Sequence, residues 1–277
     1  MLLTLAALAL AVLAPTFHYH QFGDPTRMAR DAGFSALLMC GGVLAVFGTI
    51  RSFRREIESG TLEMALAHPV SRTGCFLAKA AGAFAAYLAF AVVTFGATLV
   101  MYEGAAVGGD LARQTGDIAR IYAPCLGCGV GLAILPLAAG ALLNRFAHFR
   151  FVLTAFALAV FLAVLCVGGV AFLRGRDVAR LLPVAVAIVL FTSVLQAAAA
   201  AFSVRLRANA AASAVGVLFA LAVPCAGNYY LVDALGGGGS LSWGYVGLAA
   251  AVTAPALVAF LLLGVHFING RDIQWTL

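Results

Sequence analysis

Long uninterrupted apolar stretches dominate this sequence, and they limit its possible folds more than any other feature. A helix that crosses a bilayer needs about 20 mainly apolar residues, and several stretches here reach roughly that length. Only 10% of the 277 residues are charged and 64% are hydrophobic, whereas soluble domains are about 25% charged and about 45–50% apolar. Backbone groups in lipid must be hydrogen-bonded internally, and the stretches do not alternate in polarity. We therefore expect one all-α domain, residues 1–277, forming a polytopic transmembrane helical bundle.

We expect about eight spans, within a range of six to eight. The first has no basic n-region and no small-x-small cleavage site before Pro15, which favours a retained span over a signal peptide. The seventh is short and contains Pro224, so a re-entrant or tilted segment is an alternative. Between the fifth and sixth spans, Arg174 to Arg180 are expected to form a basic outer turn. The spans lie near residues 1–17, 34–50, 76–101, 121–143, 151–173, 181–202, 211–227 and 243–267.

Basic residues between the spans predict the orientation of the chain, because cytoplasmic loops carry an excess of Lys and Arg. With the N-terminus in the cytoplasm, ten of the 17 basic residues but only four of the 11 acidic residues fall on the cytoplasmic side. Both termini are therefore expected in the cytoplasm, and the chain in a bacterial inner membrane. The basic residues form no single stripe, so the net charge of +6 does not indicate nucleic-acid binding. The cytoplasmic ten are Arg51, Arg54, Arg55, Arg72, Lys79, Arg145, Arg150, Arg205, Arg207 and Arg271.

No Asp, Glu, Lys or Arg lies in the middle of a predicted span. Ionisable residues inside a membrane mark proton relays and ion pathways. Their absence argues against an ion-coupled carrier, so the energy for any transport would have to come from another source.

The segment between the second and third spans, residues 51–75, is the most informative part of the chain. We expect a helix from about Arg54 to Ala67, because a proline at position 69 disfavours the α conformation of the residue before it. Ser71 or Thr73 can cap the helix that follows. The acidic face of the first helix favours a basic protein surface as its partner, although an interfacial helix lying on the headgroups is the alternative. That face would hold Glu56, Ser59, Gly60, Glu63 and Ala67.

The run EIESGTLEMALAHPVSR, residues 56–72, resembles the signature of permease subunits in the type-2 ATP-binding-cassette exporter family. Those permeases read approximately E-x-E-x-G-T-L-E-x-L-L-x-x-P-x-S-R in the same place, between the second and third spans. Ala65 replaces the usual leucine, and Ala78 replaces a common glycine. The matching residues are Glu56, Glu58, Gly60, Thr61, Leu62, Glu63, Leu66, Pro69, Ser71 and Arg72.

The resemblance implies a permease that couples ATP hydrolysis by a separate P-loop ATPase to export or translocation of a substrate. The short cytoplasmic helix would sit in a groove of that ATPase, with two permease chains, identical or related, and two ATPases in the working unit. Glu56, Glu58 and Glu63 would make charge contacts, Gly60 would permit close approach, and Pro69 would fix the elbow. ATP and Mg would be held by the partner. The chain itself cannot hydrolyse ATP by a P-loop, because that motif needs a lysine after glycine and the single lysine lies between alanines. No catalytic residue, metal site or cofactor is expected on this chain.

The resemblance does not identify the substrate. Apart from Gln196, the polar residues of the spans are mainly Ser and Thr, which favours an amphipathic or lipid-like cargo, or a mechanical role. A membrane anchor that recruits a cytoplasmic protein without transport fits the same acidic helix.

A membrane-embedded metal or redox enzyme is the third interpretation, and it rests on two residue pairs. His18 and His20 are two residues apart with no further ligand near them in the sequence. Cys125 and Cys128 have the spacing of a redox or metal pair, but they lie in a Gly-rich span, where small residues allow helices to pack closely.

Overall fold

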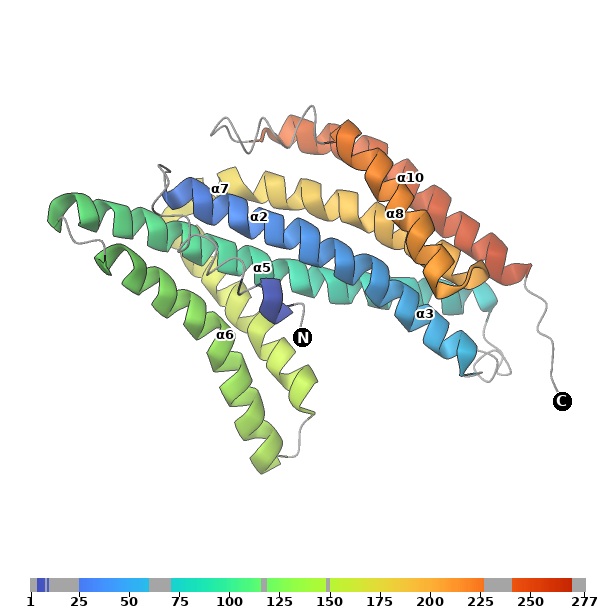
Figure 1. Cartoon of the computed structure of the whole chain (residues 1–277), viewed down its shortest axis with the longest axis horizontal. Helices are drawn as coiled ribbons and strands as arrows, with labels where there is room; N and C mark the ends of the chain where they lie inside the picture. The colour runs from blue at the N-terminus through green and yellow to red at the C-terminus, as the bar shows by residue number, and fades with distance from the viewer. Residues whose placement is uncertain are drawn as a thin grey trace. The chain divides into compact units, whose positions relative to one another are not determined.

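The fold consists of helices throughout the described part of the chain (Figure 1). A computed structural model of the whole chain describes residues 4–7, 9, 25–59, 71–115, 119–147, 150–226 and 241–270, and it contains no strand within them. This confirms the predicted all-α class. The helices are α2 (Pro25–Val43), the π-helix η1 (Leu44–Gly48), α3 (Thr49–Glu58), α5 (Arg72–Thr115), α6 (Ala119–Ala147), α7 (Phe151–Arg205), α8 (Ala208–Ala226) and α10 (Trp243–Asn269).

Five helical stretches among the described residues are long and apolar enough to cross a membrane, which confirms a polytopic helical membrane protein. Two shorter apolar helices, Ile134–Phe146 and Ala208–Ala220, fall within α6 and α8. Most of the predicted first span lies outside the described residues. The predicted seventh span corresponds to α8, a helix of 19 residues. The five long stretches are Thr26–Glu58, Arg72–Ala106, Phe151–Leu173, Val178–Arg205 and Trp243–Asn269.

Helix α7 differs from the sequence prediction, because the expected turn between Arg174 and Arg180 is helical. The structure has one uninterrupted helix of 55 residues, with Pro183 inside it. Charged residues do not break a helix, since Arg and Ala are among the better helix formers. Gly175 alone costs only about 1 kcal/mol relative to alanine. The predicted turn was therefore wrong, although the two apolar stretches on either side of it are present.

Helix α2 begins earlier than the predicted second span and contains charged residues. Proline at position 25 opens the helix, where its missing N–H costs nothing and its fixed φ is already helical. Arg30 is only 8% exposed, and its Nε lies 2.9 Å from Oδ1 of Asp31. Adjacent opposite charges thus allow the helix to extend into a region that the sequence predicted as an outer loop.

The helices form two compact units, and unit 1 comprises Met1–Cys40 and Ala89–Ala185. Small residues let its helices approach closely. A Cβ added to Gly33 on α2 would lie 2.2 Å from Oγ1 of Thr98 on α5. Two groups of buried residues form the core of this unit: Val93, Ala97, Leu132, Ala159 and Ala163, and separately Ala29, Met101 and Ala105.

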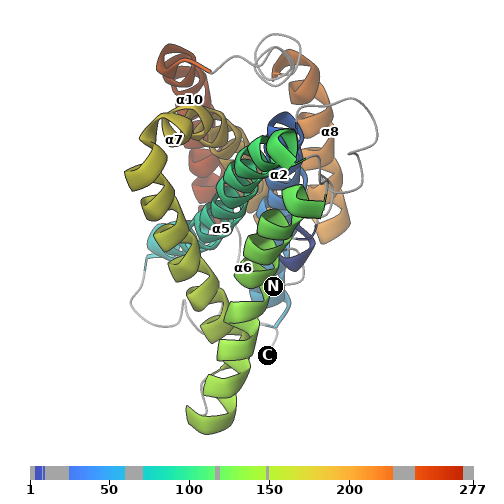
Figure 2. The ribbon, with the colours of Figure 1, turned by 90° about the vertical axis from the view of Figure 1, so that its left-hand side faces the viewer.

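Helix α6 and the first part of α7 lie side by side within unit 1 (Figures 1 and 2). A Cβ added to Gly140 on α6 would lie 2.8 Å from Cβ of Ala155 on α7, so glycine is required at this contact. Gly96 of α5 makes a similarly close approach to Ala163 of α7. Tight packing of small residues is a common means of helix association in membranes.

Unit 2 comprises Gly41–Leu88 and Val186–Leu277 and contains both ends of the predicted coupling segment. Its two cores join α3, α5, α7, α8 and α10. The buried residues of one are Val46, Ile50, Leu195, Ala198, Ala199, Ala211 and Val215, and those of the other are Phe53, Phe76, Ala200, Val204 and Ile268.

Candidate functional site

Helix α3 ends at Glu58, with Ser59 as its C-cap. Of the predicted helix from Arg54 to Ala67, residues 54–58 are helical, and residues 60–67 lie outside the described residues. Residues 54–58 form the last turn of a helix that runs on from α2 and η1.

An ion pair joins the end of α3 to the beginning of α5. The ammonium of Lys79 contacts Oε2 of Glu56, and the two side chains are 13% and 47% exposed. The Lys79 ammonium also lies 5.1 Å from the centroid of the Phe53 ring. A cation over an aromatic face is attracted by the ring quadrupole. The charge of this largely buried lysine is thus met by one carboxylate and one ring, both from α3.

Aromatic packing strengthens the same contact. The rings of Phe53 and Phe76 are 5.5 Å apart between centroids, a distance typical of favourable aromatic pairs. Both are buried in the cluster that includes Val204 of α7 and Ile268 of α10. A Cβ added to Gly264 of α10 would lie 2.2 Å from Cζ of Phe76, so only glycine leaves room for the ring. The two flanks of the coupling segment are therefore fixed to each other and to two further helices.

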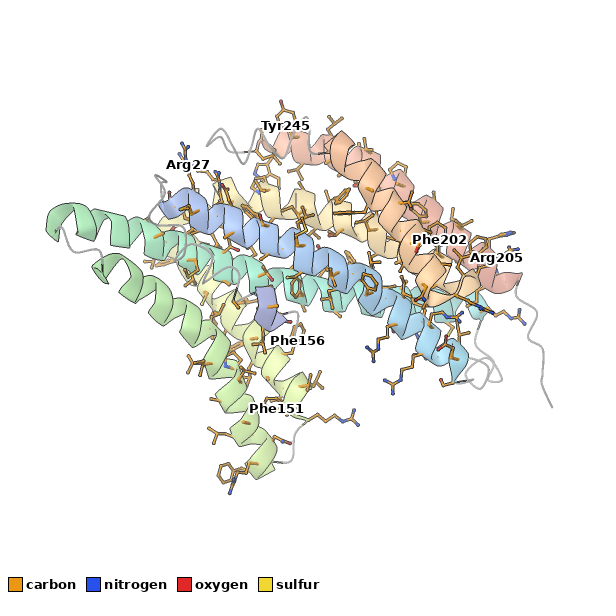
Figure 3. The ribbon with its side chains drawn as sticks, in the orientation of Figure 1. Arg27, Phe151, Phe156, Phe202, Arg205 and Tyr245 are labelled. Atoms are coloured by element: carbon orange, nitrogen blue, oxygen red, sulfur yellow. The ribbon has the colours of Figure 1, made fainter. Side chains whose placement is uncertain are left out.

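Basic residues lie at the end of unit 2 where α3 ends and α5 begins. They are among the residues predicted to share one side of the membrane. Arg54 pairs with Glu58 at 2.9 Å, and the guanidinium of Arg205 lies 5.4 Å from the centroid of the Phe267 ring. Figure 3 shows Arg205 at the end of α7. Arg51, Arg55 and Arg207 are exposed at the same end.

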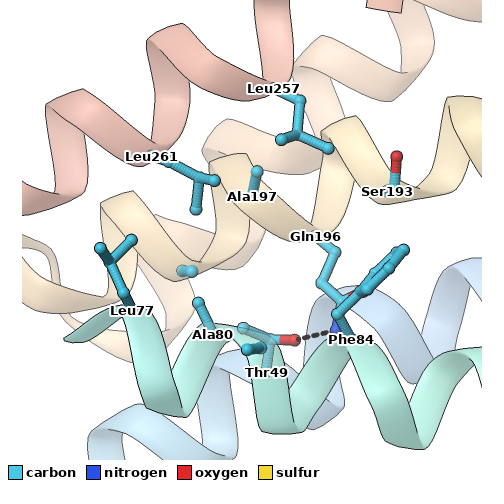
Figure 4. A pocket seen from close by; sticks show the side chains of 11 residues that line it. Thr49, Leu77, Ala80, Phe84, Ser193, Gln196, Ala197, Leu257 and Leu261 are labelled. Atoms are coloured by element: carbon cyan, nitrogen blue, oxygen red, sulfur yellow. Dashed lines mark hydrogen bonds between the residues drawn. The ribbon is translucent and has the colours of Figure 1, made fainter. Parts of the chain in front are cut away.

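A pocket of about 350 Å³ opens among α3, α5, α7 and α10 of unit 2 (Figure 4). Most of its lining is apolar, and its polar side chains are Thr49, Ser193 and Gln196. Nε2 of Gln196 donates a hydrogen bond of 3.2 Å to Oγ1 of Thr49. Oε1 of Gln196 is buried and has no hydrogen-bond partner among the described residues. The sequence analysis noticed Gln196 as an unusual polar residue but did not predict this pocket.

The side chains of the enzyme interpretation all lie outside what the structure describes. His18 and His20 lie outside the described residues. Cys125 and Cys128 lie on α6, but their side chains are outside the described set. Within the described ranges, no group of three or more His, Cys, Asp or Glu is placed to hold a metal ion.

The comparison with protein families decides the identity of the chain. Residues 1–165 match the family model described as "ABC-2 family transporter protein". The chain belongs to this family. The match covers more than half of the chain and includes the whole segment from residue 51 to 75. No curated protein and no solved structure matches this chain.

Four of the ten signature residues of this ABC-2 family protein lie in the described structure. Glu56 and Glu58 are on α3, Ser71 precedes α5, and Arg72 is its first residue. Oγ of Ser71 accepts a 3.1 Å hydrogen bond from the N–H of Gly74, which confirms the predicted cap. The other six lie outside the described residues: Gly60, Thr61, Leu62, Glu63, Leu66 and Pro69.

Sequence reasoning missed Lys79 and Phe53 as partners of the ABC-2 signature. A signal was present, since Lys79 is the single lysine of the chain and lies near an acidic segment. The pairing itself spans 23 residues of sequence, and helix spacing within one segment does not predict it.

Replacing Glu56 with glutamine is expected to lower the free energy of unfolding of the ABC-2 protein by about 1–2 kcal/mol, because it removes the carboxylate beside a largely buried ammonium. Breaking a fully buried ion pair costs about 3–5 kcal/mol, and the half-exposed carboxylate reduces that figure here. The exchanged pair, Glu56→Lys with Lys79→Glu, should recover only part of the loss, because it restores opposite charges but places a carboxylate against the negative face of the Phe53 ring. The free energy of unfolding of each variant, determined in detergent and compared with that of the wild type, provides the measurement.

Glu58→Gln is the matched control, because its exposed pair with Arg54 is worth about 0.5 kcal/mol or less. Equal losses for Glu56→Gln and Glu58→Gln would contradict a stabilising role of the Glu56–Lys79 pair.

Proposed function

We propose that this ABC-2 family protein is the permease subunit of an ATP-binding-cassette transporter, driven by a separate P-loop ATPase that docks on residues 51–75. One observation carries the proposal. The signature at residues 56–72 connects the end of the apolar stretch Thr26–Glu58 to α5, and the adjoining helix ends are fixed together by the Glu56–Lys79 pair and by the Phe53–Phe76 contact. A segment held in this way is suited to pass a displacement to both helices at once.

The coupling proceeds through the packed cluster at this end of unit 2. When the ATPase closes around nucleotide, it moves the docked segment and with it the ends of α3 and α5. Phe53 and Phe76 pack against Val204 of α7 and Ile268 of α10. Because close-packed groups transmit strain, the same displacement reaches α7 and α10. The ends of four helices thus respond to one docking event.

The charges of the segment are divided between two roles. The half-exposed carboxylate of Glu56 pairs with Lys79, so we assign Glu56 to positioning the flanks. Glu58 is exposed at the end of α3, and we assign it, together with Glu63, to contact with basic residues of the ATPase. Complementary charges across an interface set orientation and association rate more than affinity. Gly60, Thr61, Leu62, Leu66 and Pro69 complete the docking surface, and Arg72 begins the helix that leaves it.

The proposed assembly contains two permease chains, identical or related, and two ATPase subunits, with ATP and Mg bound by the ATPases. The segment and both termini face the cytoplasm of a bacterium. The chain performs no ATP hydrolysis of its own. The few polar groups within the spans favour export of an amphipathic or lipid-like substrate.

The proposal is tested by purifying the epitope-tagged chain in mild detergent from its native membrane and identifying the proteins that accompany it. We expect a P-loop ATPase in amounts similar to the tagged chain. A purified chain that is folded, but from which every nucleotide-binding protein is absent under several mild detergents, would contradict the proposal and favour the anchor interpretation.

A further inference from the structure

We propose that the pocket of unit 2 is a binding site for a small neutral amphipathic molecule, an alkyl chain that carries a hydrogen-bond donor received by Gln196. The pocket lies within one chain and is lined by residues that the ATPase-docking segment does not include. The inference concerns binding by this chain alone and does not depend on the ATPase.

Gln196 supplies the polar contact. Its side chain is 5% exposed, and its Nε2 is occupied by Thr49. Its Oε1 is the buried acceptor that lacks a partner among the described residues. Leaving a buried acceptor without a hydrogen bond is unfavourable, because its desolvation is not compensated. The amide is held in place by its bond to Thr49 (Figure 4), and a ligand O–H or N–H that displaces the atoms covering Oε1 would remove that cost.

The other polar groups of the pocket are already hydrogen-bonded, so they restrict the ligand. Oγ of Ser193 donates to the carbonyl of Leu190 at 2.7 Å, and Oγ1 of Thr49 accepts from Gln196. A charged head group would enter a site lined mainly by alanine, leucine and phenylalanine, where an unpaired charge is strongly disfavoured. A neutral hydroxyl or amide satisfies the acceptor without that penalty.

The apolar remainder of the pocket fits an alkyl chain. Its apolar lining includes Leu77, Ala80, Phe84, Leu257 and Leu261. The volume of about 350 Å³ is at the small end of the range for ligand pockets. One water molecule occupies about 30 Å³ of liquid, so the pocket volume corresponds to about a dozen non-hydrogen atoms. A medium-chain alcohol is therefore the simplest molecule that meets both the polar and the apolar requirements.

The position of Thr49 supports a specialised site. The π-helix η1 ends at Gly48, directly before Thr49, and single π-helical turns occur frequently at functional sites. Thr49 and Glu56 both belong to α3, while Leu77 and Lys79 both belong to α5. The two helices that hold the Glu56–Lys79 pair thus also form walls of the pocket.

Photoaffinity labelling of the purified chain in nanodiscs tests the inference, using decanol that carries a diazirine as the probe. We expect saturable labelling of peptides that contain Leu77, Phe84 or Leu257. Gln196→Leu should reduce labelling about fivefold, because a net hydrogen bond contributes about 1 kcal/mol. A decane with the same diazirine should label the wild type and Gln196→Leu equally.

Two further variants keep the test informative if Gln196→Leu perturbs folding. Ser193→Ala removes another buried hydroxyl of the lining that is already bonded to its own helix, and it should leave labelling unchanged. Ala197→Leu places a larger side chain in the pocket, and leucine is a good helix former, so α7 should be retained. This variant should reduce labelling by both probes. Equal labelling of the wild type by decanol and decane, or unchanged decanol labelling of a folded Gln196→Leu variant, would overturn the inference.

The same experiment distinguishes two sources of the ligand. Competition by hydroxyl-bearing lipids of the nanodisc would identify the bilayer as the source. Competition by free decanol, but by none of those lipids, would identify a small molecule that enters independently of the bilayer. Both outcomes support binding at Gln196.

Discussion

Reversing the charge of Glu63 with Glu63→Arg is expected to reduce the amount of co-purified ATPase about tenfold or more. The proposed docking surface meets a basic surface of the ATPase, and like charges placed opposite each other cost several kcal/mol. Each 1.4 kcal/mol corresponds to about a factor of ten in affinity. Quantitative comparison of the ATPase recovered with wild-type and variant chains provides the measurement.

A change at Glu56 or Glu58 would also break an ion pair inside the described part of the chain, and its effect on the ATPase would be mixed with an effect on stability. Glu56 contacts Lys79, and Glu58 pairs with Arg54. Asp272→Arg is the matched control, since it makes the same reversal on the predicted cytoplasmic side but outside the segment. Equal recovery of ATPase with Glu63→Arg and with the wild type would remove Glu63 from the docking surface.

Replacing Gly33 with alanine is expected to lower the free energy of unfolding by about 2–3 kcal/mol, the upper part of the range for overpacked sites. The new Cβ would lie 2.2 Å from Oγ1 and 2.7 Å from Cβ of Thr98. A rotamer change of Thr98 moves Oγ1 but leaves its Cβ in place. Helices α2 and α5 would therefore have to move apart within unit 1, and thermal unfolding in detergent measures the loss.

Gly42→Ala provides a control on the same helix, because a Cβ at Gly42 meets nothing within 4 Å. Alanine should stabilise the helix there by about 0.5–1 kcal/mol. Combining Gly33→Ala with Thr98→Gly should restore part of the stability, because it removes the Thr98 side chain with which the new Cβ at position 33 clashes. Similar effects of the alanine substitutions at both glycines would show that close packing at Gly33 does not contribute to stability.

The helical membrane fold was predictable from the sequence because lipid leaves the backbone few alternatives. Hydropathy located the apolar stretches, including residues 151–173 and 181–202. It did not predict that α7 continues between them. The prediction treated charge as a sign of a turn, whereas local helix propensity at Arg174 to Arg180 favours a helix. The predicted start of the second span was wrong because charged residues were again taken as a loop. In the structure Arg30 and Asp31 lie within α2 and neutralise each other.

The candidate sites were predictable only where their residues are close in sequence. The signature at residues 56–72 is local, and so is the Ser71 cap. The Glu56–Lys79 pair and the Gln196–Thr49 hydrogen bond join separate helices. Such contacts depend on which faces of the helices meet, and periodicity within one helix does not specify its partner. Gln196 stood out as a polar residue in an apolar span, but the pocket beside it required the packing of four helices.

Site-specific cross-linking from position 63 tests the central claim most directly. A photoreactive amino acid is placed at Glu63, and another at Leu262, which is 63% exposed on α10. After irradiation of intact cells, position 63 should cross-link to a P-loop ATPase, whereas Leu262 should not. Cross-links from position 63 to this chain or to lipid alone, with no nucleotide-binding protein among the products, would contradict the proposal that residues 51–75 couple the permease to an ATPase.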